Sequence, residues 1–178
     1  MRFVAVDVET ATQGRSGTIC QIGVAVFSDG ALVDQWTSLV DPKAPNQFTH
    51  IHGITDEHVR GAPTFAEVYP PVRDLLQGEV VASHTGFDKG AFSQATARAG
   101  VPALEYTWVD TARVVRSTWP QFRTRGYGLG NIAAYLGIKF QHHDALHDAI
   151  TAGRVWLAAC EASGKSISDW VEKIGEKV

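Results

Sequence analysis

The sequence is poor in cysteine and methionine and has no long apolar run. Its 178 residues include two cysteines and one methionine. Cys20 and Cys160 stand alone, without the spacing of a zinc or redox motif, which argues against a disulfide-built secreted domain and predicts two reduced thiols. The most apolar late stretch, 155–160, is too short to span a bilayer. We therefore expect a cytoplasmic protein with no membrane partner.

Positive charge is also scarce. Sixteen Lys and Arg against nineteen Asp and Glu give a net charge of −3, and the pI is about 6.1. This balance argues against a protein that coats nucleic acid with a broad basic surface, but not against an enzyme that grips a few nucleotides. Met1 and Arg2 run directly into the first predicted strand, so we expect no signal peptide. The length predicts a single domain, 1–178.

The stretch 4–10, VAVDVET, is a valine-rich apolar run that two acids interrupt at alternating positions. It has the composition of a buried strand, and a strand sends residues i and i+2 to the same face. Asp7 and Glu9 would therefore project together, where they repel each other and lose hydration. A divalent cation between them is the favoured interpretation. The alternative pairs one acid with a buried arginine and lets the other reach solvent at the strand end.

The order of elements predicts an α/β fold. Strands at 2–8, 18–28 and 31–41, with a polar connection at 11–17 and a turn at 28–30, suggest an antiparallel meander. Two further strands alternate with helices, which predicts a mixed five-stranded sheet, antiparallel and then parallel, flanked by helices. These strands are at 79–83 and 105–110, and the helices are near 55–59 and at 64–77, 87–99, 111–117, 128–136, 145–163 and 166–177.

Prolines and the chain end add two expectations. Pro70 and Pro71 should kink or break the helix at 64–77, because proline removes a helical hydrogen bond. The segment 164–178 is expected to form an amphipathic helix packed on the domain. Asp110 is best explained as the N-cap of the following helix.

Two more aspartates stand at predicted helix starts. Asp88 follows a strand and a tight turn, so it lies at a strand's carboxyl end, where α/β sheets bind ligands. Alternatively, Asp88 is only a helix-start residue that the helix dipole stabilises. Asp148 lies among small residues near the start of its helix, where an aspartate is costly unless something positive meets it. His143 converges with Asp148 if it belongs to the loop before that helix. Alternatively, the histidine-rich segment 142–147 is a solvated loop.

Together these residues resemble a known family. Three motifs are similar to those of the DEDDh exonucleases: Asp7-x-Glu9, the Phe-Asp turn at Asp88, and His143-x-Ala145-x-x-Asp148. These are 3′→5′ exonucleases of ribonuclease H-like fold, related to the proofreading epsilon subunit of bacterial DNA polymerase III. The segments 51–55 and 61–65 also resemble that family. The spacing to Ala145 and Asp148 favours His143 over the adjacent His142.

One segment departs from the family pattern. Family members commonly have His-Asn-Ala before Phe-Asp, whereas this chain has His84-Thr85-Gly86. A substrate contact made by the asparagine would be altered here, while the metal ligand Asp88 is untouched.

The resemblance implies a two-metal mechanism. Two Mg²⁺ or Mn²⁺ ions would offset the charge of the four carboxylates, activate water and stabilise the leaving 3′ oxygen. His143 would accept the proton of the water. The product would be a 5′-nucleoside monophosphate. The metal ligands would be Asp7, Glu9, Asp88 and Asp148.

Substrate contacts are implied in the same way. The backbone of Thr10 and Ala11 would meet the terminal sugar, and His52, Ile54 and Phe87 would lie near the terminal base. Core packing is the alternative for the apolar residues. Arg123 and Arg125 could contact the incoming backbone, or they could be solvated loop residues.

The substrate class stays open at this point. We expect single-stranded 3′ ends, with DNA favoured over RNA; an RNA-trimming exoribonuclease and a non-catalytic nucleic-acid-binding module are the alternatives. The lack of a long tail after Val178 weakly disfavours tethering to a DNA polymerase, although a polymerase partner is kept as an expectation. A homodimer is left open, with Trp170 on the last helix as a candidate contact.

Overall fold

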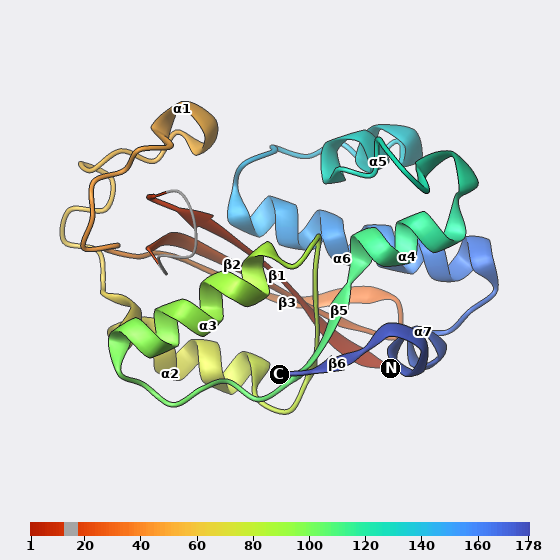
Figure 1. Cartoon of the computed structure of the whole chain (residues 1–178), viewed down its shortest axis with the longest axis horizontal. Helices are drawn as coiled ribbons and strands as arrows, with labels where there is room; N and C mark the ends of the chain where they lie inside the picture. The colour runs from red at the N-terminus through yellow and green to blue at the C-terminus, as the bar shows by residue number, and fades with distance from the viewer. Residues whose placement is uncertain (13–17) are drawn as a thin grey trace.

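A six-stranded mixed sheet lies between two layers of helices (Figure 1). The structure, a computed structural model, describes residues 1–12 and 18–178, so most of the expected polar connection at 11–17 lies outside the described residues. The strand order is β3-β2-β1-β4-β5-β6; β1–β3 are antiparallel, β4 and β5 run parallel to β1, and β6 is antiparallel to β5. The strands are β1 (Arg2–Thr10), β2 (Ile19–Ser28), β3 (Ala31–Leu39), β4 (Val80–Ser83), β5 (Thr107–Asp110) and β6 (Glu176–Lys177).

The helices cover both faces of this sheet. The second and third helices pack on one face, and the last four α-helices pack on the other (Figure 1). In the described residues they are α1 (Thr49–His52), α2 (Phe65–Leu76), α3 (Phe87–Ala99), α4 (Thr111–Thr118), the 3₁₀ turn η1 (Pro120–Phe122), α5 (Leu129–Leu136), α6 (Ala145–Ser163) and α7 (Ile167–Ile174). None of them is long and apolar enough to cross a membrane.

Strand β1 shows why the two faces differ. Its even-numbered valines pack toward α2 and α3, and the odd-numbered Phe3 and Ala5 pack toward α6. Because side chains alternate along a strand, Asp7 and Glu9 continue the α6 face. The expected common face of the two acids is therefore present in the structure.

Helix α6 lies very close to β2. An added Cβ at Gly153 would lie 2.2 Å from the ring of Phe27, so only a glycine fits there. The Phe27 ring also stacks on Phe3 with centroids 5.0 Å apart, which fills the space beside β1. Dispersion and apolar burial thus fix the helix against the centre of the sheet.

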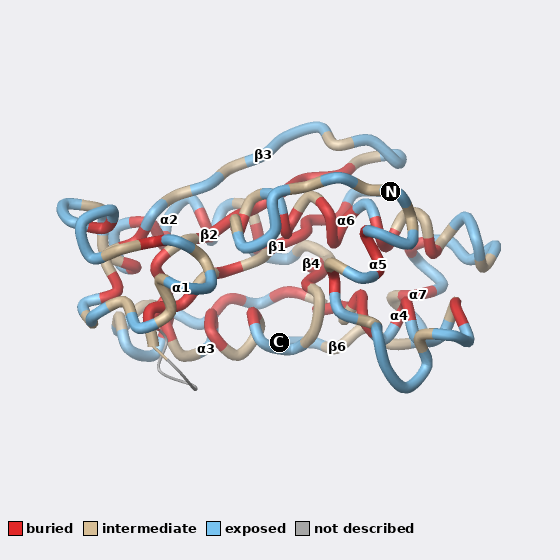
Figure 2. Tube along the Cα trace, turned by 90° about the horizontal axis from the view of Figure 1, so that it is seen from above, coloured by how far each residue is buried: buried red, intermediate tan, exposed pale blue. Residues whose placement is uncertain are grey.

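The sheet has six strands instead of the expected five, because the last helix ends early. Helix α7 stops at Ile174, and Gly175 turns the chain into an extended conformation. Glu176 then pairs with Trp108 of β5, and its carboxylate binds Lys89 and Arg113. These contacts form only in the tertiary structure, so helical periodicity could not reveal them. At the opposite edge, β3 is exposed along most of its length (Figure 2).

The prediction of a helix near 55–59 is wrong. Residues 56–61 form successive turns, closed by short-range bonds such as the His58 amide to the Thr55 carbonyl at 3.1 Å. The helical turn lies earlier, in α1, and Gly53 ends it with a φ of 76°. Local capping by Thr55 and His58 side chains competes with helix formation in this segment.

Of the two outcomes expected at the prolines, a kink or a break, the break is wrong. Helix α2 runs without interruption through Pro70 and Pro71, and Thr64 and Glu67 form a capping box at its start. The carbonyls that lose their helical donors belong to Ala66 and Glu67, which are exposed. Water can satisfy those carbonyls, so the cost of each proline is reduced.

The last helix packs as expected, but its tryptophan is not available for a partner. Trp170 is 1% exposed and lies in the apolar cluster beneath α6. The idea of Trp170 as a dimer contact is therefore wrong. Cys20 is buried, Cys160 is partly buried, and both are free thiols.

Candidate active site

Three carboxylates meet where β1 ends and α6 begins. Oxygen atoms of Asp7, Glu9 and Asp148 all lie within 4.8 Å of one another. The first two come from the α6 face of β1, and the third comes from the first turn of α6. The sequence prediction that these acids converge is met by the geometry.

The approach of α6 depends on a glycine opposite Asp7. Gly23 of β2 pairs with Asp7, and a Cβ there would lie 2.2 Å from the carbonyl carbon of Ala145. Any other residue would push the start of α6 outward. Gly23 therefore lets Asp148 come within reach of Asp7.

Side-chain hydrogen bonds fix the start of α6 further. Gln21, opposite Glu9 in the sheet, donates to Asp144 at 3.3 Å and accepts from the amide of Ala145 at 3.2 Å. Asp144 in turn caps α6 by accepting from the amide of His147 at 3.1 Å. The amide side chain of Gln21 thus joins the sheet to the cap of the helix.

Asp88 reaches the site from the first turn of α3. Its side chain is 2% exposed, and Oδ1 accepts from the amide of Val8 at 3.0 Å. This amide needs a partner because β1 and β4 pair only at Val4–Val81 and Ala5–Ala82 and have separated by Val8. Asp88 lies outside the closest group of oxygens, yet its charge is the second cause of the raised pKa of Asp7.

The four acids make the site strongly unfavourable for negative charge. Burial raises the pKa of Asp7 well above its usual range, and Asp88, Asp148 and Glu9 raise it further. Burial, followed by the charges of Asp148 and Asp88, raises the pKa of Glu9 to about 7. Burial also raises the pKa of Asp88 to about 7, although the Val8 amide opposes this. Such a cluster is stable only if protons or cations compensate it.

Two neighbouring histidines approach Asp148 in different ways. Nδ1 of His142 lies 3.0 Å from each Asp148 oxygen. His143 instead donates its backbone amide to Asp148 at 3.2 Å, and its ring stacks on that of His142 with centroids 3.9 Å apart. The backbone of His143 has a φ of 66°, a conformation that histidine tolerates better than most residues.

The contact between His142 and Asp148 was not expected. The motif spacing favours His143, and in that pattern His142 is only the preceding residue. The left-handed turn at His143 brings the two rings together, and no sequence periodicity signals such a turn. Both histidines and Asp148 also form a group whose ligand atoms are close enough to share a metal ion.

A cavity of about 220 Å³ opens beside the acids. Of the expected substrate contacts, Thr10, His52 and Phe87 line it, together with Glu9. Thr12, Phe48 and Ile51 were missed, because single loop residues carry no pattern that marks a cavity wall. Phe87 is 51% exposed, which is unusual for phenylalanine and leaves its ring available to a ligand.

Ala11 and Ile54 do not line this cavity. Both are buried in a small apolar cluster with Cys20 and Val59. The backbone of Ala11 is also engaged, since its amide donates to Thr18 at 2.8 Å and its carbonyl accepts from Gln47 at 2.7 Å. For the side chains of these two residues, the alternative of core packing therefore describes their positions.

His52 connects the segment after α1 to the end of β1. Its Nδ1 accepts from the amide of Ile54 at 3.0 Å, and Nε2 lies 3.3 Å from the carbonyl of Thr10, to which it donates. Burial lowers the pKa of His52, so the neutral ring with a proton on Nε2 suits both bonds. The imidazole thereby holds the end of β1 against the loop after α1.

The turn before Asp88 carries backbone strain. Thr85 has a φ of 87°, a rare conformation for a β-branched residue. Asp110 stabilises it by accepting from the Thr85 amide at 3.1 Å while capping α4 through the amide of Ala112 at 2.8 Å. The expected N-cap role of Asp110 is confirmed, and the same carboxylate holds the turn that leads to Asp88.

Comparison with known proteins decides the family. The RNase_T family model, described as Exonuclease, matches residues 4–156. The chain belongs to this exonuclease family. The curated relatives include the PolC-type DNA polymerase III of Streptococcus suis, which is 32% identical over 158 residues. That match covers 86% of this chain and 11% of the polymerase, so the exonuclease spans only a small part of the length of this relative.

Solved structures share the fold of this exonuclease. Exonuclease X in complex with 5′ overhanging duplex DNA has a TM-score of 0.76 at 22% identity, and the match covers 96% of this chain and 98% of that one. The nuclease domain of 3′hExo, a DEDDh family member bound to rAMP, has a TM-score of 0.75 at 18% identity, with 99% and 97% covered. The expected ribonuclease H-like fold and the resemblance to DEDDh exonucleases are confirmed.

Proposed function

We propose that this exonuclease is a metal-dependent 3′→5′ exonuclease that releases 5′-nucleoside monophosphates from nucleic-acid ends, with DNA favoured over RNA. The observation that carries the proposal is the convergence of Asp7, Glu9 and Asp148 within 4.8 Å, with Asp88 beside them. We take residues 1–178 as one exonuclease domain.

The donor set fits two divalent cations. Asp7, Glu9, Asp88 and Asp148 offer oxygen ligands only, which suits Mg²⁺ or Mn²⁺. Burial is the first cause of the raised pKa of each of these carboxylates, and bound cations would offset that cost. When bound, two such ions would supply an activated water and charge stabilisation of the leaving 3′ oxygen.

The histidines have separate proposed roles. His143 would accept the proton of the attacking water on a ring nitrogen, and burial together with His142 lowers its pKa, which favours the neutral form. His142 would orient Asp148 through the contact at Nδ1. The strained backbone at His143 holds both rings at the start of α6.

The 220 Å³ cavity is the proposed place of the terminal nucleotide. Phe87 and Phe48 offer ring faces for stacking on a base, a contact that tolerates any base. Thr10 and Thr12 supply polar atoms on the side of the sugar. Glu9 connects this cavity to the acids, so a nucleotide bound there would present its phosphate to them.

DNA is the preferred substrate in this proposal because the curated relatives are DNA polymerases and one solved neighbour holds duplex DNA. The neighbour bound to rAMP makes an exoribonuclease the second candidate. The similarity to a PolC-type polymerase also supports a DNA polymerase as partner.

The test is a time course on a 5′-labelled single strand of DNA and a matched RNA, with Mg²⁺ or Mn²⁺ and with EDTA. We expect a ladder that shortens from the 3′ end, faster on DNA, and no cleavage in EDTA. Asp7→Asn should lower the rate by about 10³-fold or more, since a metal ligand and its charge are lost. Asp34→Asn, on the exposed strand β3, is the matched control and should cleave like the wild type.

Each alternative gives a different result. Faster loss of the RNA strand would establish the exoribonuclease. If the folded, metal-loaded wild type binds both strands but cleaves neither, the protein is a non-catalytic binding module.

A further inference from the structure

A second cavity, far richer in positive charge, lies on the α4–α7 side of the molecule. It has a volume of about 460 Å³ and is lined by Arg113, Arg116, Ser117, Arg123 and Lys173. All five residues are exposed, and four of them are cations. In a chain of net charge −3 this is a marked local concentration of positive charge.

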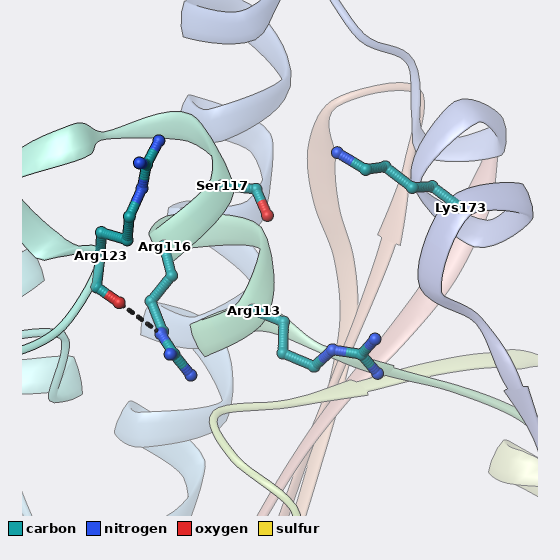
Figure 3. Close-up of a pocket in the computed structure, with 5 residues that line it drawn as sticks. All are labelled: Arg113, Arg116, Ser117, Arg123 and Lys173. Carbon is teal, nitrogen blue, oxygen red and sulfur yellow. Dashed lines mark hydrogen bonds between the residues drawn. The ribbon is translucent and has the colours of Figure 1, made fainter.

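Three separate segments bring these cations together. Arg113, Arg116 and Ser117 are spaced three and four residues apart, so they share one face of α4. Arg123 follows the η1 turn, and Lys173 comes from the last turn of α7. Figure 3 shows the Lys173 side chain extending from α7 toward the face of α4 that carries Ser117.

The cations have little internal compensation. Arg113 binds Glu176 at 2.9 Å, but Glu176 also binds Lys89 at 2.8 Å. The Nε of Arg116 donates to the carbonyl of Arg123 at 2.8 Å, a bond that orients the guanidinium without neutralising it (Figure 3). Among residues 1–12 and 18–178, neither Arg123 nor Lys173 forms a salt bridge.

Structural roles explain only part of this cluster. The guanidinium of Arg116 lies over the Tyr127 ring at 4.9 Å, and the Lys173 ammonium lies 5.1 Å from the centre of the Trp170 ring. Such contacts are typical of single cations. They do not account for four cations around one cavity, because like charges repel each other there.

We propose that this cavity binds phosphate groups, separately from the acidic active site. Guanidinium groups bind phosphate through paired N–H donors, and the Ser117 hydroxyl adds a further donor. The volume exceeds that of one phosphate and suits a run of linked phosphates. The source is either the backbone of a nucleic-acid strand or a free polyphosphate; the strand rests on the proposed function, whereas phosphate binding itself does not.

The best variant changes two of the cavity cations for which the described residues offer no carboxylate, Arg123→Gln with Lys173→Gln. The control, Arg60→Gln with Arg73→Gln, removes the same charge from exposed arginines on other segments. Both are compared with the wild type by thermal unfolding, to show that each is folded. All binding is measured in EDTA, where the acidic site repels phosphate and cleavage is absent.

The first arm measures the anisotropy of a long 5′-labelled single strand over a series of salt concentrations. We expect the cavity variant to bind about tenfold more weakly than the wild type, and its salt slope to fall by about 1.4 for two lost phosphate contacts. The control should change affinity by less than about twofold. A loss equal in both double variants would overturn the strand as the source, because net charge alone would explain it.

The second arm titrates inorganic triphosphate by calorimetry. Lost triphosphate binding in the cavity variant, with unchanged strand affinity, would assign the cavity to a free polyphosphate. If neither ligand distinguishes the cavity variant from its control, the phosphate site does not exist. A wild type that cleaves no strand with metal would overturn the proposed function, while the triphosphate arm would still report on the cavity.

Discussion

Asp88 and Asp148 both reach the acidic cluster from the first turn of a helix, yet they are held by different kinds of donor. Asp88 accepts from the backbone amide of Val8, in the middle of the sheet. Asp148 accepts from the ring of His142, an exposed loop residue, and from the amide of His143. Asp88 is thus held by an amide of a central strand, and Asp148 by a side chain and an amide of the loop before its helix.

The two helix starts also depend on different local features. The turn before α3 contains the strained Thr85, held by Asp110, whereas the approach of α6 depends on the missing side chain at Gly23. The α6 side should therefore be disrupted by adding atoms to the sheet. On the α3 side, the protein should be stabilised by relieving the backbone strain at Thr85, in the turn before α3.

The largest effect is expected for Gly23→Ala, which should displace α6 and with it Asp148. The new methyl group would overlap the backbone of Ala145, so we expect a loss of about 3 kcal/mol in stability and most of the nuclease activity. Chemical denaturation and the strand time course measure both.

Gly90→Ala is the matched control on α3, where an added Cβ has no neighbour within 4 Å. It should stabilise the protein by about 0.5 kcal/mol through helix propensity. Equal stability of the two variants would show that the start of α6 can shift freely.

The next effect is the pH dependence of the metal-free protein. Glu9 and Asp88 have folded pKa values of about 7, above their ordinary values. The folded state then holds protons that the unfolded chain releases, so stability falls as pH rises from about 5 to about 8. The buried Asp88 should account for most of this loss, because solvent screening reduces the contribution of Glu9.

Thermal unfolding in EDTA across this range measures that loss. Added Mn²⁺ should restore most of the stability at the upper end, because a ligand that binds only the folded state stabilises it. A stability that rises with pH in EDTA would contradict the compensation of the four acids by protons.

A smaller effect separates the two histidines. His142→Ala leaves the buried Asp148 carboxylate with one donor fewer, which should cost about 1 kcal/mol. His143→Asn keeps the backbone amide and a residue type that tolerates a positive φ, so stability should change little while activity falls sharply. Unfolding and single-turnover cleavage of both variants test the assignment, and the reverse pattern would make His142 the base.

The smallest effect should come from Thr85→Asn. Asparagine adopts a φ of 87° more readily than β-branched threonine, so we expect a gain of about 1 kcal/mol or less. Thr124→Asn, in an exposed loop, is the control. No difference between the two in thermal unfolding would mean that Asp110 already removes the cost of the turn.

The acids and their elements could be predicted from the sequence because their positions follow from strong periodicity. Asp7 and Glu9 stand in a valine alternation, and Asp88 and Asp148 follow clear breaks before helices. Gly175 and the strand after it could not be predicted, since Glu176 is placed by partners 63 and 87 residues away. Phe48 and Ile51 were hidden for the same reason, because a loop residue lines a cavity only through the tertiary fold.

Helix α6 meets β2 at two glycines, one on each element: Gly23 receives the backbone of Ala145, and Gly153 receives the ring of Phe27. The helix is therefore located by two places where side-chain atoms are missing. For protein engineering this separates two tasks. Apolar residues around these points can be exchanged for others of similar volume to tune thermostability, while Asp148 keeps its position as long as both glycines stay.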